Sequence, residues 1–209
     1  DSGEEPETSA AQSNGEETGA LLAYIDTLST DVVSTNALKI VDAYVDALNS
    51  TDSGEGIFYP DETNADQFWT AILYYEINQR GYLDADDVNY WMYKGYRMDS
   101  RQNVQDVANA MYGHVVELPP RDYVPSYCPK DSDTCYYFGI GNRGAVQVVL
   151  DSFEQSNDGS AVLKLSYLYP PERKVYLTAT VQMRVNPNVN YDGEIPFYYM
   201  IESVEIHHP

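Results

Sequence analysis

The stretch VYLTATVQMRV, residues 175–185, decides the fold class of the chain. Its apolar residues occupy every second position from Val175 to Val185, and tyrosine, threonine, glutamine and arginine fill the positions between them. Successive side chains of a β-strand point to opposite faces of a sheet. The alternation therefore predicts an antiparallel strand with one buried and one solvated face.

Neighbouring segments predict further strands. The runs AVQVVLDSFEQ (145–155) and AVLKLSYLY (161–169) flank an Asp-Gly pair (158–159), which favours a β-hairpin. The residues FYYMIESVEI (197–206) have the composition of a last strand. We expect a four-stranded meander, with an earlier strand or hairpin around YCPKDSDTCYYF (127–138).

Ahead of the strands, apolar residues recur at the spacing of amphipathic helices. This spacing begins at Leu21 and again at Val41, where the second helix is expected to begin near the candidate caps Ser34, Thr35 and Asn36. Later helices are expected from Asn64 to Gly81, from Asp84 to Gly95 and from Ser100 to Gly113, with a brief strand GYRMD (95–99) before the last helix.

Helices followed by strands predict an α+β fold in which N-terminal helices pack on one face of a C-terminal antiparallel sheet. We expect a single domain over residues 20–209, mainly helical over 20–113 and mainly β over 114–209. Residues 1–19 contain no aromatic or branched apolar side chain. They predict a disordered acidic tether, because they cannot bury enough surface to offset their conformational entropy.

The charge restricts the possible partners. The chain has 33 acidic and 12 basic residues and a formal net charge of −21. This balance repels phosphate backbones and anionic headgroups, so nucleic acid is not an expected partner, and a membrane is expected only through a lipid anchor. The oligomeric state does not follow from the sequence.

The N-terminus and the cysteines predict an extracellular or cell-surface location. A mature chain that opens in an acidic spacer is typical of a secreted protein or of a lipoprotein cut after its lipid-bearing cysteine; a trimmed cytosolic protein is the alternative. Cys128 and Cys135 enclose the polar loop PKDSDT, which favours a local disulfide. Two reduced thiols in a cytosolic protein are the alternative.

Three glycines raise the question of a nucleotide. Gly139, Gly141 and Gly144 have the G-x-G-x-x-G spacing of dinucleotide-binding proteins. That motif works only when its last glycine opens a helix, whose free N–H groups hold the pyrophosphate. The valine-rich residues after Gly144 favour a strand, so we expect turn or bulge glycines and no bound cofactor.

Metal sites are also not expected. His207 and His208 are adjacent, so in an extended chain they point to opposite faces. Two aspartate clusters resemble fragments of calcium loops but lack the glycine and glutamate of an EF-hand. Helix capping explains the first cluster and turn formation the second. The clusters are Asp84, Asp86 and Asp87, and Asp131 and Asp133.

The most unusual feature is the 20 tyrosines, against 5 Phe and 2 Trp. Tyrosine combines an apolar ring with a hydroxyl that needs a partner, which suits half-solvated recognition surfaces. We expect a ligand-binding surface at Tyr90, Trp91, Tyr93 and Tyr96. The alternative is that these rings pack between helices and sheet.

Several stretches resemble a known class of protein. The acidic spacer, the helical first half and the segments ELPPRDY, DGSAVLKLSY and YYMIESVEI resemble uncharacterised surface lipoproteins of Gram-positive anaerobes. The layout is also similar to cystatin-like and NTF2-like folds. These resemblances imply an α+β fold and export, and they carry no functional residues.

The leading functional hypothesis is an exported, surface-anchored, non-catalytic protein that recognises a carbohydrate or protein ligand through tyrosine and tryptophan. No G-x-S-x-G, H-E-x-x-H or Walker motif is present, so an enzyme is the less favoured class. A hydrolase with two carboxylates in a helix-sheet cleft is one alternative. A structural or assembly domain is the other.

Overall fold

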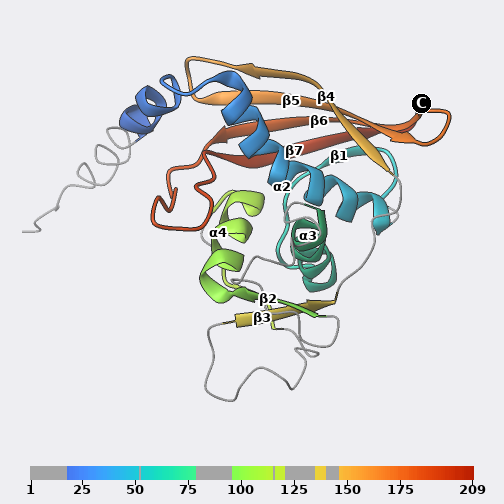
Figure 1. The fold of residues 1–209 in the computed structure, drawn as a ribbon, viewed down its shortest axis with the longest axis horizontal. Coiled ribbons are helices and arrows are strands. Elements are labelled where there is room, and N and C mark those ends of the chain that lie inside the picture. The colour runs from blue at the N-terminus through green and yellow to red at the C-terminus, as the bar shows by residue number, and fades with distance from the viewer. Residues whose placement is uncertain (1–17, 52, 79–95, 115, 121–134, 140–145) are drawn as a thin grey trace, which may run out of the picture.

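The structure, a computed structural model, describes residues 18–51, 53–78, 96–114, 116–120, 135–139 and 146–209. It has the α+β architecture expected from the sequence (Figure 1). A five-stranded antiparallel sheet has the order β1-β7-β6-β5-β4. Its strands are β1 (Gly56–Phe58), β4 (Gln147–Gln155), β5 (Ser160–Tyr169), β6 (Lys174–Val185) and β7 (Tyr199–His207).

The meander from β4 to β7 confirms the expected four strands, and β1 adds a fifth beside β7. β1 was not expected, because its three residues contain a glycine and follow a loop-like stretch. The expected hairpin at 158–159 is present, with Gly159 at φ 87°. A positive φ is accessible to glycine at little cost, so this residue suits the turn.

The alternation in β6 is confirmed. Leu177, Ala179, Val181 and Met183 are at most 2 % exposed, whereas Gln182 and Arg184 are exposed. The pairing of β5 with β6 shifts between Tyr167 and Leu168, and beyond this irregularity Val175 is only half-buried. One face of the sheet is therefore the core, and the other faces solvent.

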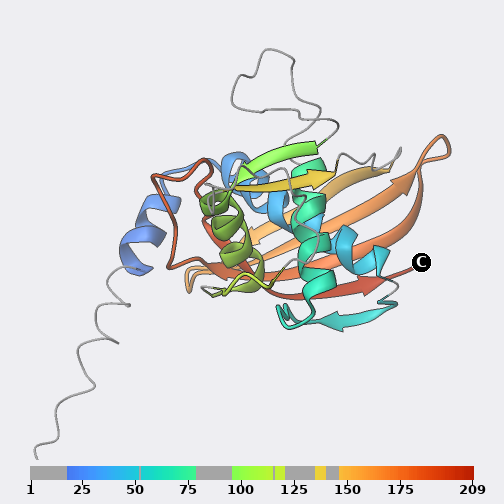
Figure 2. The same ribbon diagram turned by 90° about the horizontal axis from the view of Figure 1, so that it is seen from below.

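Three helices form the layer beneath the apolar face: α2 (Thr30–Ser50) and α4 (Arg101–Tyr112) pack on the sheet, and α3 (Ala65–Asn78) packs on α2, as Figure 1 shows. Figure 2 shows the same helices from below. Beyond α3 and α4, β2 (Tyr96–Ser100) pairs with β3 (Cys135–Gly139) as a separate ribbon. Trp69 of α3 packs against Tyr136 of β3 with ring centroids 5.1 Å apart. The core thus extends from the sheet through the helices to the ribbon.

Two predicted helix ends are confirmed and one is wrong. The side chains of Asn64 and Ser100 cap α3 and α4, accepting from the N–H groups of Gln67 and Asn103. The second helix does not begin near Ser34, Thr35 and Asn36. It begins at Thr30, where the Ser29 side chain accepts from the N–H of Val32 at 3.3 Å. A serine in extended conformation is a favourable cap, so the helix gains an additional turn.

A first helix over residues 18–25 precedes α2, as expected. The predicted tether lies almost entirely outside the described residues, as does the helix expected from Asp84 to Gly95. Within the part of the chain that is described, no helix is long and apolar enough to cross a bilayer.

Gly113 ends α4 and packs against β7, and its substitution tests this contact between the helix and the sheet. Its φ is 77°, and an added Cβ would lie 3.2 Å from the carbonyl oxygen of Ile201 in β7. Gly54 has a similar φ of 74° and nothing within 4 Å of such a Cβ, so it is a matched control. We expect Gly54→Ala to lower the free energy of unfolding by about 1 kcal/mol and Gly113→Ala by about 2 to 3 kcal/mol. Equal losses of unfolding free energy in the two variants, measured by urea denaturation, would contradict a close contact between Gly113 and Ile201.

Tyr112 gives a second test of the core. Its hydroxyl is buried and has no hydrogen-bond partner among the described residues, whereas the Tyr167 hydroxyl donates to Asp42 at 3.1 Å. Because an unpaired buried hydroxyl is unfavourable, we expect Tyr112→Phe to raise the free energy of unfolding by about 1 kcal/mol and Tyr167→Phe to lower it by about 1 kcal/mol.

The same tyrosine should affect stability at alkaline pH. Burial raises the pKa of the Tyr112 and Tyr44 hydroxyls above the usual 10.0. Below pH 10 both hydroxyls are therefore neutral in the folded and the unfolded chain, and the free energy of unfolding falls as the pH rises from 10 towards the folded-state pKa, because only the unfolded chain ionises readily. Stability of Tyr112→Phe should fall less steeply above pH 10 than that of the wild type; an unchanged slope would contradict this assignment.

Candidate functional site

The aromatic surface expected from the sequence lies largely outside the described residues. Tyr90, Trp91 and Tyr93 are not described, and Tyr96 begins β2 without a described side chain. That surface stays a prediction. The expected disulfide also stays a prediction, because Cys128 lies outside the described residues and only the backbone of Cys135 is described.

The strand expected after the glycine motif is confirmed. Gly139 ends β3, and β4 begins at Gln147, so the first described element after Gly144 is not a helix. Gly141 and Gly144 themselves lie outside the described residues. The two aspartate clusters, Asp84 to Asp87 and Asp131 with Asp133, are not described either. Among the residues that are described, no group of three or more His, Cys, Asp or Glu could hold a metal ion.

The best candidate site is built on the connection between β6 and β7, residues 186–198. Asn186 closes the base of this connection: its N–H donates to the carbonyl of Tyr198 at 2.8 Å, and its side-chain amide donates to that of Phe197 at 2.9 Å. Its side-chain oxygen also accepts from the N–H of Asn188 at 3.0 Å. Asparagine favours such turns because its short side chain can bond the backbone two residues on.

Two helices fasten the connection to the domain. The side chain of Asn36 in α2 donates to the carbonyl of Pro196 at 2.7 Å and accepts from the N–H of Tyr198 at 3.2 Å. Asp106 in α4 accepts from the side-chain amide of Asn190 at 2.8 Å. In Figures 1 and 2 the connection runs beside α4 and approaches helix 18–25. The loop is therefore held on a rigid scaffold, as binding loops often are.

A cleft lies between this connection and helix 18–25. Its volume is about 300 Å³, and it is lined by Ala20, Leu21, Pro187, Val189 and Tyr191. The lining is apolar apart from the tyrosine hydroxyl and the backbone. Small-molecule sites are commonly hollows of this kind with a few polar groups at the rim.

Three tyrosines form an aromatic wall beside the cleft, and of these Tyr191 belongs to the cleft lining. The rings of Tyr24 and Tyr191 meet edge to face, with centroids 6.0 Å apart and an interplanar angle of 83°. The ring of Tyr198 also contacts Tyr24, with its centroid 6.0 Å from that of Tyr24. Tyr24 is 43 % exposed and Tyr191 57 %, whereas Tyr198 is buried. We call these three residues and the cleft lining the tyrosine cleft.

The hydroxyl groups of Tyr191 and Tyr198 stay protonated at physiological pH. Burial raises the pKa of Tyr191 and of Tyr198 above the usual value of 10.0, and a hydrogen bond with Tyr24 raises the pKa of Tyr198 further. The wall therefore presents neutral rings with hydroxyl donors.

Other exposed tyrosines lack these features. Tyr169 and Tyr176 stack face to face at the β5–β6 hairpin, with centroids 4.1 Å apart, so each ring covers a face of the other. Tyr59 is 71 % exposed, just beyond β1. None of these three tyrosines is among the residues that line the cleft.

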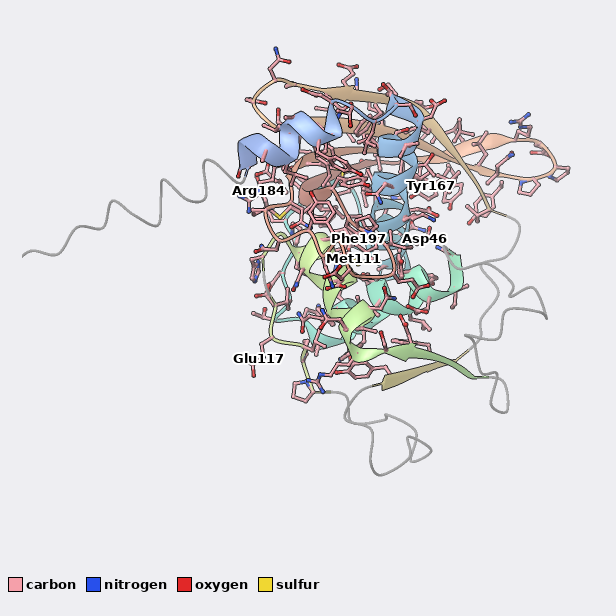
Figure 3. All side chains as sticks on the ribbon, turned by 60° about the vertical axis from the view of Figure 1, so that its left-hand side comes forward. Asp46, Met111, Glu117, Tyr167, Arg184 and Phe197 are labelled. Carbon is pink, nitrogen blue, oxygen red and sulfur yellow. The ribbon has the colours of Figure 1, made fainter. Side chains whose placement is uncertain are left out.

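Carboxylates are buried elsewhere in the molecule. Asp42 and Asp46 of α2 are 4 % and 8 % exposed, and they accept from Tyr167 and from the side-chain amide of Asn78. Figure 3 labels Tyr167 and Asp46, which come from the sheet and from the helix layer. Neither carboxylate lines the tyrosine cleft. These acids are thus part of the packing between α2, α3 and β5.

Sequence reasoning missed the tyrosine cleft because its parts are distant in the chain. Tyr24 lies in helix 18–25, and Tyr191 lies in the connection between β6 and β7. One signal was present: the run NPNVNYDG (186–193) places a tyrosine among turn-forming residues, where an aromatic ring is exposed.

Comparisons with known proteins found no relative of this chain. The chain matches no protein-family model, no curated protein and no solved structure.

The role of Asn36 can be tested directly. Asn36→Ala leaves the Pro196 carbonyl and the Tyr198 N–H without their partner, so we expect the free energy of unfolding to fall by about 2 kcal/mol. Hydrogen exchange at the Tyr198 amide should accelerate, whereas the Asn188 amide, held by Asn186, should exchange at its wild-type rate. Unchanged exchange at Tyr198 would contradict the fastening role of Asn36.

Proposed function

We propose that this protein is an exported, non-catalytic binding protein that captures a carbohydrate or protein ligand at the tyrosine cleft. The observation that carries the proposal is the pair of half-exposed rings, Tyr24 and Tyr191, beside an apolar cleft of about 300 Å³. Aromatic walls of this kind supply a large contact area with a hydroxyl at the rim.

Preorganisation supports a binding role. The connection that presents Tyr191 is fastened by Asn36 and Asp106, and Tyr191 itself packs against Tyr24. A ligand that docks here meets a wall that is already ordered. Less conformational entropy is then lost on binding than with a free loop.

The cleft lining favours binding over catalysis. Its five described residues include no carboxylate, imidazole, thiol or aliphatic hydroxyl. The hydrolase alternative would need two carboxylates in one cleft. The buried carboxylates Asp42 and Asp46 lie outside this cleft and bond to Tyr167 and Asn78.

The location at the cell surface belongs to the same proposal. The acidic segment that precedes helix 18–25 would act as a tether between the domain and a lipid anchor or a secreted N-terminus. Cys128 and Cys135 would form a disulfide in that oxidising environment. Thiol alkylation followed by mass spectrometry checks the disulfide, because paired cysteines take up no reagent before reduction.

The binding role predicts a selective effect of Tyr191. On glycan and peptide arrays, Tyr191→Ala should lose about tenfold or more in apparent affinity for the captured ligand, because it removes a half-exposed anchor. Tyr59→Ala removes another exposed tyrosine away from the cleft and should bind as the wild type does.

The same arrays test the surface expected from the sequence. Trp91→Ala and Tyr93→Ala should weaken binding if the residues from Tyr90 to Tyr96 also contact the ligand. Equal binding by the wild type and Tyr191→Ala would remove the tyrosine cleft from the proposal, and equal binding by Trp91→Ala and Tyr93→Ala would remove the second surface.

A further inference from the structure

We propose that the group recognised in the tyrosine cleft is an alkylated ammonium, an organic cation of the kind found in the trimethylammonium head of choline. This inference rests on the binding role proposed above and names the chemistry of its ligand. Three features of the site support it: the orientation of the rings, the charge around them and the apolar lining.

The rings are oriented to receive a cation. The face of an aromatic ring is electronegative and attracts a cation placed above it. Tyr24 and Tyr191 meet edge to face at 83°, so the edge of one ring covers part of one face of the other, and both residues remain about half-exposed. Each ring therefore keeps at least one face that its partner does not cover, and a methylated ammonium group beside the cleft can be attracted to such a face.

The surrounding charge also favours a cation. Helix 18–25 and the connection 186–198, which supply the cleft lining, contain no lysine or arginine. The connection includes Asp192 and Glu194, and Asp26 follows the helix. The adjoining Arg184 bonds to the Gly113 carbonyl at 3.0 Å and pairs with Glu202 at 3.3 Å. With a net charge of −21 on the whole chain, a cation is attracted to this site and an anion is repelled.

The lining selects among cations. Ala20, Leu21, Pro187 and Val189 offer no oxygen ligands from their side chains, so a metal ion or a bare ammonium would lose its hydration shell without replacement. An alkylated ammonium carries its charge inside an apolar surface and is weakly hydrated. It can therefore enter an apolar cleft and still be attracted to the ring faces.

The tyrosine hydroxyls do not supply the attraction as anions. The pKa of both Tyr191 and Tyr198 is raised by burial, so neither forms a phenolate at physiological pH. The ring faces and the long-range field of the carboxylates remain as the sources of attraction. A phenylalanine at position 191 should consequently preserve cation binding.

The decisive experiment compares a cation with its neutral isostere. Choline and 3,3-dimethylbutan-1-ol have nearly the same shape, and only choline is charged. In NMR titrations of the full chain we expect choline to bind about tenfold more tightly than the alcohol, with the shifts centred on Tyr24 and Tyr191. Equal affinities, or no binding of choline, would overturn the inference.

Variants at position 191 distinguish the effect of the aromatic ring from the effect of side-chain size. Tyr191→Phe should retain the preference for choline, whereas Tyr191→Leu, which keeps an apolar side chain without a π face, should lose it. Tyr169→Leu is the matched control at the stacked pair and should leave the preference unchanged. A preference that survives in Tyr191→Leu would also overturn the inference.

Two further probes identify the source of the cation. A peptide containing trimethyllysine, compared with its unmethylated form, tests presentation by a polypeptide. Phosphocholine, whose phosphate should be repelled by the acidic protein, is expected to bind more weakly than choline; tighter binding would contradict the charge argument. If choline and its isostere bind equally while Tyr191→Ala still loses array binding, the cation inference fails and the binding function stands.

Discussion

The one-sided burial of the sheet is the constraint on which the rest of the structure depends. A single row of paired apolar residues crosses all five strands on the inner face, namely Phe153, Leu163, Val181, Val204 and Phe58. A shift of one residue in any strand would move its part of this row to solvent. The register is therefore fixed by burial, and α2, α3 and α4 are required to cover the face that the register creates.

The same register makes the outer face polar and leaves the end of the sheet as the place for a site. Ser152, Lys164, Thr180 and Glu205 pair in a row across four strands, with Ile57 at the edge. Such a row is well solvated and offers no hollow. Where β6 leaves the sheet, the chain makes a long excursion before β7, and its polar backbone must be bonded. Asn36 and Asn186 bond to this backbone, and Asp106 accepts from the side chain of Asn190. Together these bonds hold the connection that places Tyr191 beside Tyr24.

Local patterns in the sequence were sufficient for most of the fold but not for the site. The β6 alternation and the caps at Asn64 and Ser100 are signals between near neighbours, and each was confirmed. The second helix begins earlier than expected because Ser29, and not Ser34, is its N-cap. β1 carries too short a signal to be recognised, since it is ordered by pairing with β7. The tyrosine cleft depends on contacts between helix 18–25 and the connection 186–198, which are distant in the sequence, so no local pattern predicts them.

The abundance of tyrosine is explained by two different roles in one acidic domain. Tyr44, Tyr75, Tyr167 and Tyr199 are fully buried and act as large core residues, with Tyr167 and Tyr199 also hydrogen-bonded to Asp42 and Gln155. Tyr24 and Tyr191 lie at the surface, where a phenylalanine would expose the same ring without a solvated hydroxyl. On a surface with so few basic residues, ring faces and carboxylates are the groups left to attract a ligand. Both attract positive charge, so the composition of this surface favours the cationic ligand that we propose.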